Sequence, residues 1–474
     1  MKRFILFAFC LFCYLGASAQ SVSSLIESGN QKLQDADIAG AIADFGKAIE
    51  NDPSSAEAYY NMGMALSAND NYERALANFD KAIELNPRYA GACLQRGIIY
   101  MALEDADKAM ADYNRAVSAD PALADAYLWR GLALEAGGDN QGALDDYGKV
   151  IELLPGLPTG YIQRGRLRMV MGGNLNHALQ DLNNAVFMDS TSVEAYTTRG
   201  TLYRLRRDNQ NALSDLIISQ QLNPDYAPTY WELAAVKTAM KLFDSAIEDY
   251  AKLMTLEPSN PQVYISRGLA KAMKNDFDGA LADYGIAQMM DPQNTDVYFH
   301  RSKIKYYHQD LKGAIAEIDK GISINPNNYD LYLERATYKS ENKDYKGAYD
   351  DYTLLITKIP DSPDIYIARA GAGILMNDMT SAGADLKKAI SLGLNDPQVY
   401  FQTGQMKTRM KDYKGAIADF DKAIALAPDV PYAYLERGIA KALSGNKTSG
   451  CEDMDKAKEM GDPAADEAIT QYCK

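Results

Sequence analysis

The chain has 474 residues, and its 64 acidic side chains against 49 basic ones give a formal net charge of −15 at pH 7. Nucleic-acid binding needs clustered Lys and Arg that displace counterions from phosphates, so this charge balance excludes nucleic acid as a partner class. No segment after the N-terminus approaches about eighteen uninterrupted apolar residues, so no transmembrane helix is expected.

Residues 1–19 have the pattern of a secretory signal peptide. Lys2 and Arg3 precede an unbroken apolar run over residues 4–15, which is too short for a stable membrane anchor. Residues 17–19, Ala-Ser-Ala, then supply the small side chains that a signal peptidase recognises. The segment therefore predicts export and removal of residues 1–19.

Export would leave Gln20 as the first residue and remove two cations, which changes the net charge to −17. Neither Cys10 nor Cys13 follows the small residues that precede the lipidated cysteine of a lipoprotein, so lipid attachment is not expected. The N-terminus predicts an exported protein, periplasmic or extracellular.

From about Val22 to about Asp462, small residues recur with a spacing of 34 residues, which is the mark of a repeated structural unit. The first series, the glycine position, comprises Gly29, Gly63, Gly97, Gly131, Gly165, Gly200, Ala234, Gly268, Ser302, Ala336, Ala370, Gly404 and Gly438. The second series, the alanine position, comprises Ala41, Ala75, Ala109, Ala143, Ala178, Ala212, Ala246, Ala280, Ala314, Ala348, Ala382 and Ala416. The spacing slips by one residue at Gly172 and Gly173, a turn sequence that can absorb an insertion between paired helices.

One complete repeat, from Ala58 to Ala90, shows the remaining pattern. Its characteristic residues are Tyr59, Gly63, Tyr72, Ala75, Phe79, Ala82 and Pro87, where the proline ends the second helix. This pattern resembles the tetratricopeptide repeat family. The resemblance implies an all-α fold, a right-handed superhelical solenoid of about thirteen 34-residue helix-turn-helix repeats over residues 20–462. It also implies a protein or extended peptide as partner, bound in a concave groove that the first helices line.

Tyrosine fills the first aromatic position of most repeats, which accounts for the high tyrosine count. A helix pair cannot bury its apolar face alone, so neighbouring repeats stack and share a continuous core. We therefore expect these rings to pack between helices rather than to serve catalysis. The series is Tyr59, Tyr127, Tyr161, Tyr196, Tyr230, Tyr264, Tyr298, Tyr332, Tyr366, Tyr400 and Tyr434.

A charge pair distinguishes this chain from the usual family pattern. Nine repeats have arginine, where the family usually has leucine, just before the glycine position: Arg96, Arg130, Arg164, Arg199, Arg267, Arg301, Arg335, Arg369 and Arg437. Twelve repeats have an acid just before the second aromatic position, and only Asn78 interrupts the series: Asp44, Asp112, Asp146, Asp181, Asp215, Asp249, Asp283, Glu317, Asp351, Asp385, Asp419 and Asp453. Arginine can meet a carboxylate with two parallel hydrogen bonds between packed helices. The complementarity predicts structural ion pairs within repeats, namely Arg96–Asp112, Arg130–Asp146, Arg267–Asp283, Arg301–Glu317, Arg335–Asp351, Arg369–Asp385 and Arg437–Asp453.

Two alternatives stay open for these charges. Each arginine could also be shared with the neighbouring repeat, which complementarity does not exclude. The arginines could instead form an anion-binding stripe, although the number of matching acids favours the structural role.

No catalytic or metal-binding constellation is recognisable in the sequence. His300 and His308 are too far apart for the one-turn spacing of a helical metal pair, and His177 stands alone. No phosphate loop, nucleotide fingerprint or nucleophile elbow occurs, and the repeat spreads the carboxylates along the chain. We therefore expect no enzyme activity, no metal and no cofactor.

The inner face of the array is the candidate partner surface. The residue after the first aromatic position is apolar in nearly every repeat, in the series Tyr60, Leu94, Leu128, Ile162, Thr197, Trp231, Ile265, Phe299, Leu333, Ile367, Phe401 and Leu435. Bulky aromatic side chains beside a cation are typical of protein-binding hot spots. The candidate partner-binding residues are Tyr60, Trp231, Phe299, Lys303, Tyr306 and Phe401. The alternative is that this apolar stripe packs against neighbouring helices as core.

Residues 463–474 are expected to cap the array, because a last repeat has no neighbour to cover its apolar face. Apolar residues at helical spacing predict a short helix from Pro463 to Tyr472. Cys451 and Cys473 are expected to form a disulfide in an oxidising compartment, while Cys93 occupies a core position. The alternative is that the first two stay as free thiols.

These features predict a non-enzymatic protein-interaction scaffold in a bacterial cell envelope, as part of a secretion, outer-membrane or surface-polysaccharide assembly. A glycan-binding module, which the tyrosines and carboxylates favour, is the alternative. The scaffold is preferred because the repeat itself requires most tyrosines in the core.

Overall fold

A computed structural model describes residues 21–173, 175–393 and 396–473. The expected signal peptide, residues 1–19 with Cys10 and Cys13, lies outside these ranges. Every secondary-structure element in the described ranges is an α-helix. None of these helices combines the length and the apolar composition needed to cross a membrane.

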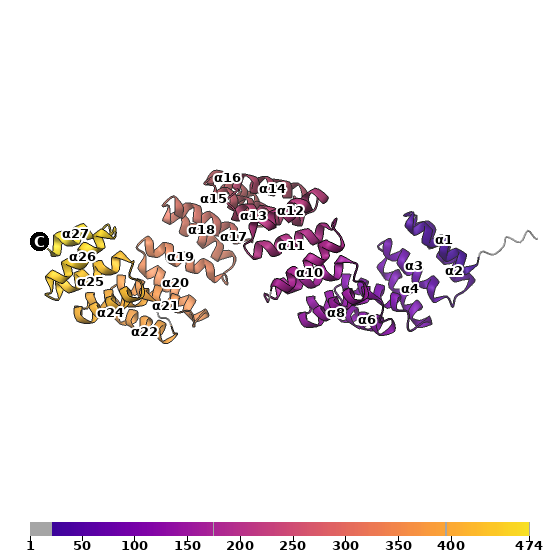
Figure 1. Ribbon diagram of the computed structural model, residues 1–474, viewed down its shortest axis with the longest axis horizontal. Helices are drawn as coiled ribbons and strands as arrows, with labels where there is room; N and C mark the ends of the chain where they lie inside the picture. The colour runs from indigo at the N-terminus through magenta and orange to yellow at the C-terminus, as the bar shows by residue number, and fades with distance from the viewer. Residues whose placement is uncertain (1–20, 174, 394–395, 474) are drawn as a thin grey trace, which may run out of the picture. The chain divides into compact units, whose positions relative to one another are not determined.

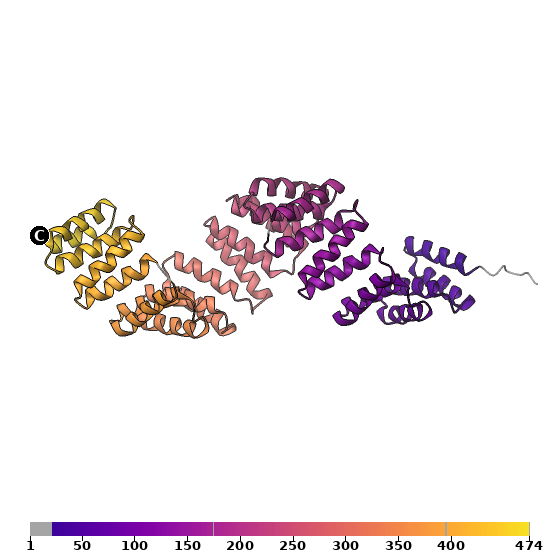
Figure 2. The same cartoon turned by 60° about the horizontal axis from the view of Figure 1, so that its bottom comes forward.

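The helices form two compact units, Met1–Met240 (the N-terminal unit) and Lys241–Lys474 (the C-terminal unit). Within each unit every helix packs against the next along the chain (Figures 1 and 2). The N-terminal unit contains α1 (Val22–Gln34), α2 (Ile38–Asn51), α3 (Ala56–Ala68), α4 (Tyr72–Leu85), α5 (Ala90–Ala102), α6 (Ala106–Ala119), α7 (Ala124–Ala136), α8 (Asn140–Leu153), α9 (Pro158–Val170), α10 (Leu175–Met188), α11 (Val193–Leu205), α12 (Asn209–Leu222) and α13 (Ala227–Ala239). The C-terminal unit contains α14 (Phe243–Leu256), α15 (Pro261–Met273), α16 (Phe277–Met290), α17 (Asp296–Tyr307), α18 (Leu311–Ile324), α19 (Tyr329–Glu341), α20 (Tyr345–Lys358), α21 (Pro363–Leu375), α22 (Met379–Ser391), α23 (Pro397–Arg409), α24 (Tyr413–Leu426), α25 (Pro431–Leu443), α26 (Lys447–Glu459) and α27 (Ala465–Tyr472). The helix order confirms the prediction of thirteen repeats, each a pair of helices.

Most turns within a repeat use the same two devices. The second residue after the first helix adopts a left-handed backbone, as at Glu104 with a φ of 62°, and this reverses the chain. The next residue then caps the second helix, as Asp105 does by accepting a hydrogen bond from the backbone N–H of Lys108. The turn between α9 and α10 is one residue longer than this three-residue form, which confirms the place of the predicted slip.

The small-residue series make close helix contacts possible. The alanine position is fully buried in all twelve repeats where it occurs. Where this position holds glycine opposite an aromatic ring, an added side chain would clash: a Cβ on Gly63 would lie 2.6 Å from the ring of Phe79. The tight fit explains why glycine stands opposite the ring in such repeats.

The predicted arginine–acid pairs are all present within their repeats. Arg369 is representative: its Nε and Nη2 atoms donate to the two carboxylate oxygens of Asp385 at 2.8 and 2.6 Å. Arg164–Asp181 and Arg199–Asp215 pair as well, which makes nine pairs. The same two-pronged contact occurs in seven of the other eight, whereas Arg301 donates once to Glu317 at 3.3 Å. The acids are buried, so each depends on its cation for compensation.

Several arginines are also shared with the preceding repeat. The remaining Nη1 atom of Arg335 lies 2.6 Å from Asp319, and that of Arg437 lies 2.7 Å from Asp421. These acceptors stand two residues after the acidic series of the sequence, on the same helices. Sharing therefore occurs, but through a residue on the exposed rim of the neighbouring helix.

A second cation, absent from the sequence-based prediction, also reaches the buried acid. It stands one helical turn after the arginine position, as in Lys271 with Asp283 at 2.8 Å and Lys441 with Asp453 at 2.7 Å. Burial alone would raise the pKa of Asp453, but hydrogen bonds from Arg437 and Lys441 outweigh burial and hold that pKa below its ordinary value.

Loss of the arginine should destabilise a repeat more where the buried acid has one cationic partner than where it has two. Among the described residues, Asp385 pairs with Arg369 alone. A double-mutant cycle of Arg369→Ala and Asp385→Ala should therefore give a coupling of about 1–3 kcal/mol in the free energy of unfolding, measured by urea titration. Arg267→Ala should cost less than Arg369→Ala, because Lys271 still compensates Asp283. Additive losses in the cycle, or equal losses for the two arginines, would contradict this account.

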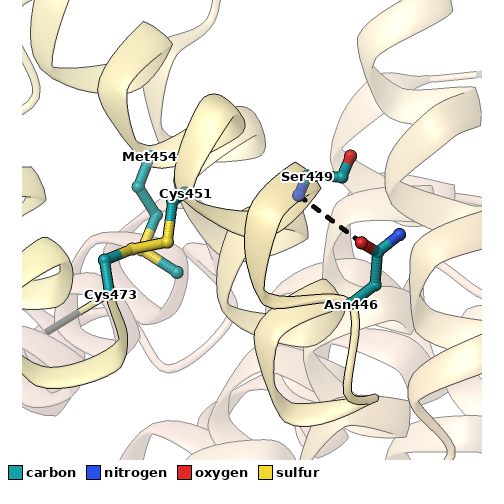
Figure 3. The surroundings of a disulfide bond; sticks show 5 residues. All are labelled: Asn446, Ser449, Cys451, Met454 and Cys473. Atoms are coloured by element: carbon teal, nitrogen blue, oxygen red, sulfur yellow. Dashed lines mark hydrogen bonds between the residues drawn. A yellow bond between two sulfur atoms is a disulfide. The ribbon is translucent and has the colours of Figure 1, made fainter.

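The C-terminal helix packs on the last repeat and is joined to it by a disulfide bond. Helix α27 begins two residues later than Pro463, because Asp462 accepts a hydrogen bond from the backbone N–H of Ala464 and holds the segment as a turn. Figure 3 shows Cys451 of α26 bonded to Cys473 at the end of α27, with Met454 beside the sulfurs. Two buried alanines, Ala465 and Ala468, set α27 against the repeat.

Loss of the disulfide should loosen this repeat alone. The bond closes a loop with a sequence separation of 22, for which chain entropy gives about 3 kcal/mol of stabilisation. Cys451→Ser should therefore speed amide hydrogen exchange in α26 and α27 and leave α15 unchanged. Equal exchange in wild type and variant would show that the bond contributes nothing.

Candidate functional site

The residues predicted to bind a partner lie on the first helices of their repeats, and they divide between the two units. Tyr60 on α3 and Trp231 on α13 belong to the N-terminal unit. The C-terminal unit holds the other four, three of them on α17: Phe299, Lys303, Tyr306 and Phe401. Only two of the six, Phe299 and Lys303, line one cavity together.

That cavity, which we call the aromatic pocket, lies among α15, α16 and α17 and has a volume of about 370 Å³. Its lining consists of Leu269, Ala272, Met273, Phe277, Tyr284, Phe299, His300, Lys303, Ile304 and Tyr307. Three large apolar side chains at its edge are exposed, Leu269 to 40%, Met273 to 48% and Tyr307 to 61%. Exposed apolar side chains gathered around a hollow are characteristic of a surface that another molecule covers.

Contacts between aromatic rings fix the shape of the aromatic pocket. Tyr307 packs on Phe277 with centroids 4.8 Å apart, and His300 stacks on Tyr284 at 5.6 Å. Because these rings come from helices of two successive repeats, the pocket is fixed by the packing of one repeat on the next.

Lys303 is the charged residue of the pocket lining. Its Nζ lies 5.0 Å from the centre of the Phe299 ring, and it forms an ion pair with Glu334 of the following repeat. Because this charge is paired, the pocket has no strong preference for an anionic or a cationic ligand.

His300 stays uncharged at neutral pH. Burial lowers the pKa of its imidazole, Asp296 opposes the shift and Lys303 adds to it. A neutral ring suits the apolar wall, since an imidazolium would place an uncompensated charge there.

The other candidate residues serve packing or a different cavity. Tyr306 stacks on Tyr338 at 4.8 Å and donates a hydrogen bond to Glu341 at 2.9 Å. Phe401 is only 9% exposed, because Tyr432 of the next repeat lies edge-on against it at 4.7 Å. Its cavity of about 220 Å³ is separate from the aromatic pocket.

In the N-terminal unit, Tyr60 packs between Tyr89 at 5.0 Å and Phe79 at 5.9 Å. Half-buried between these rings, it belongs to the edge of the core. Trp231 instead lines a cavity of about 360 Å³, the polar pocket, formed by α9, α11 and α13. The lining of this pocket is Arg166, Met169, Glu194, Thr197, Thr198, Thr201, Tyr226, Pro228, Trp231 and Glu232.

Sequence reasoning missed Leu269, Met273, Phe277 and His300 as parts of the aromatic pocket. Leu269 follows the glycine position and Met273 comes one helical turn later, so their spacing did place them on one face. Phe277 opens the second helix, at a position where several other repeats carry polar residues. Leu269, Met273 and Phe277 could have been found from the sequence only by combining three positions of the repeat: the residue after the glycine position, the residue one turn later and the first residue of the second helix.

Acid should destabilise the C-terminal unit through His300. Its folded pKa lies below the ordinary value of about 6.5, so below that pH the unfolded chain binds a proton that the folded chain resists, and stability falls as pH falls. His300→Phe should reduce the stability lost between about pH 7.5 and pH 5.5, measured by urea titration. Exposed His177→Phe is the matched control, and an equal effect of both variants would rule out His300 as the cause.

Comparison with known families gives matches in two parts of the chain, within residues 56–156 and at residues 397–430. Models of the tetratricopeptide repeat match residues 56–89, 125–156 and 397–430. A model described as TPR repeat matches residues 97–137. No curated protein matches the chain.

Three of the solved structures that match the chain have TM-scores below 0.5. The APC/C hetero-tetramer Cut9-Hcn1 has 11% identity and a TM-score of 0.42, with coverage of 96% of this chain and 97% of that chain. Yeast Tom70 has 17% identity and a TM-score of 0.38, with coverage of 95% and 94%. YrrB, described as a TPR protein with an unusual peptide-binding site, has 27% identity and a TM-score of 0.33, and covers 39% of this chain and 95% of its own.

Proposed function

This chain is a tetratricopeptide repeat protein, and on that premise we propose that it is a protein-interaction scaffold whose aromatic pocket receives an apolar segment of the partner. The family's repeats support the general role of binding proteins. The observation that carries the specific proposal is the gathering of exposed Leu269, Met273 and Tyr307 around one hollow.

The composition of the aromatic pocket favours a protein over a charged small molecule. Its lining is dominated by aromatic and aliphatic side chains, and the ammonium of Lys303 is already paired with Glu334. Interfaces that bind proteins place such side chains at the centre and surround them with polar residues that exclude water. A leucine-, methionine- or phenylalanine-sized side chain of a partner would bury against Phe299 and Tyr307.

The proposal includes a place of action, the bacterial cell envelope. It is supported by the sequence of residues 1–19, with two cations, an apolar run and a small-residue cleavage pattern. In that compartment the scaffold would hold parts of a secretion, outer-membrane or surface-polysaccharide assembly. An oxidising envelope would also suit the disulfide between Cys451 and Cys473.

A glycan-binding module is the alternative role. The aromatic pocket does not favour it, since its lining offers few hydroxyl or carboxylate groups to sugar hydroxyls. The tetratricopeptide core also uses most tyrosines for packing, as Tyr113, Tyr147 and Tyr284 show by their complete or nearly complete burial.

Truncation of the aromatic pocket should abolish partner capture. Phe299→Ala and Tyr307→Ala should each weaken binding by about 2 kcal/mol, roughly 30-fold in Kd, because a hot spot loses its buried contact. The measurement is recovery of envelope proteins on immobilised wild-type and variant chains, quantified by mass spectrometry.

Met410→Ala provides the control, since Met410 is an exposed apolar residue of another repeat in the same unit. It should retain the proteins that wild type captures. Unchanged capture by both pocket variants, or their unfolding at a lower temperature with capture intact below it, would show that the pocket residues serve only the core.

A further inference from the structure

The polar pocket of the N-terminal unit differs in chemistry from the aromatic pocket. The rings of Trp231 and Tyr226 share its wall with the hydroxyl of Thr198 and the carboxylates of Glu194 and Glu232. Its volume of about 360 Å³ lies at the lower end of the range of about 300–1,000 Å³ that small-molecule sites occupy. Amphipathic rings beside hydroxyls and acids suit a ligand that is apolar on one face and polar at its edges.

A buried hydroxyl cluster lies behind the wall of this pocket, and Thr197 is its member in the lining. Thr197 is the only small polar residue in the inner series, where other repeats have aliphatic or aromatic side chains. Its hydroxyl lies 2.7 Å from that of Ser219 and 2.9 Å from that of Thr229, and these two are 2.7 Å apart. Three hydroxyls from α11, α12 and α13 thus replace apolar packing at one place in the array.

Two of the three charged side chains that line the polar pocket, Arg166 and Glu232, form ion pairs. Arg204 donates to both oxygens of Glu232 at 2.6 and 3.3 Å. Arg166 donates to both oxygens of Glu135 at 2.8 Å. The third, Glu194, forms no ion pair among the described residues, so its carboxylate disfavours an anionic ligand.

Hydrogen-bonding capacity remains nevertheless. Glu194 is exposed and accepts one hydrogen bond, from Gln163 at 3.2 Å, so its carboxylate keeps further lone pairs for a hydroxyl donor. Burial and the nearby Glu194 raise the pKa of Tyr226, which keeps this phenol as a donor over the physiological range. The Thr198 hydroxyl offers both a donor and an acceptor.

We infer that the polar pocket binds a neutral carbohydrate, with a sugar ring stacked on Trp231 and its hydroxyls bonded to Glu194, Thr198 and Tyr226. The aromatic face meets the C–H face of the ring, and the carboxylate and hydroxyls satisfy the polar edge. This site goes beyond the proposed scaffold function and is independent of the aromatic pocket.

Trp231 itself reports on the site, because the chain has only one other tryptophan, Trp129. The full chain with Trp129→Phe is titrated with maltotetraose, cellotetraose and chitotetraose while indole fluorescence is recorded. Binding should give a saturable change for at least one tetrasaccharide. The chain with Trp231→Phe, which keeps Trp129, should give none.

Two further variants in the Trp129→Phe background test the assignment. Glu194→Gln and Thr198→Val should each weaken the affinity for that tetrasaccharide by about tenfold. Both residues lie at the pocket surface, and unchanged thermal unfolding establishes that the fold is retained. Phe299→Ala should leave the titration unchanged, so a failure of the scaffold proposal is distinguishable from a failure of this one.

Three results would overturn the inference. The first is no saturable change with any of the three sugars up to about 20 mM, well above the about 1 mM Kd of weak but specific binding. The second is a change that Glu194→Gln and Thr198→Val leave intact, which would place the sugar elsewhere. The third is saturation by tetralysine but by no sugar, which would identify the pocket as a site for a cationic peptide.

Discussion

A carboxylate buried where the two helices of a repeat cross is the constraint on which the array depends. Such an acid must be compensated, and the chain does so from two positions one helical turn apart. Arg369 does so alone, Lys407 compensates Asp419 without an arginine in its repeat, and Arg335 and Lys339 act together on Asp351. The repeat with Asn78 in place of the acid also lacks the arginine, since Met62 occupies that position. Acid and cation therefore occur together or not at all.

Because these ion pairs and the small-residue contacts fix the helices, the inner face can vary without loss of the fold. Two pockets show the range of this variation. In the C-terminal unit, Phe299 and Tyr307 make an apolar hollow with a neutral histidine in its wall. In the N-terminal unit, the same inner series supplies Thr197 and Trp231, and the result is a polar pocket. One framework thus presents two surfaces of different chemistry.

The repeats, the buried alanines and the arginine–acid pairs were predictable because each depends on residues at fixed spacing. The second cation, such as Lys271, could have been found from its helical spacing to the arginine, but the family pattern did not direct attention to it. The pockets were harder to predict. Phe299 and Phe401 hold the same position in their repeats, yet Phe401 is covered by Tyr432 whereas the equivalent residue after Phe299 is Asp330. Exposure of an inner residue is thus decided by the next repeat, which a single-repeat pattern does not contain.

The reach of arginine into the preceding repeat also gives the array a mechanical property. At three boundaries the Nη1 atom meets a carboxylate, from Arg96 to Asp80, Arg335 to Asp319 and Arg437 to Asp421. At others it meets a neutral acceptor, as Arg130 does at Asn114 and Arg369 at Thr353. Charge-assisted hydrogen bonds resist separation more strongly than neutral ones. The boundaries between repeats should therefore differ in stiffness. Under tension, we expect the repeats to separate first at boundaries without an arginine–carboxylate contact.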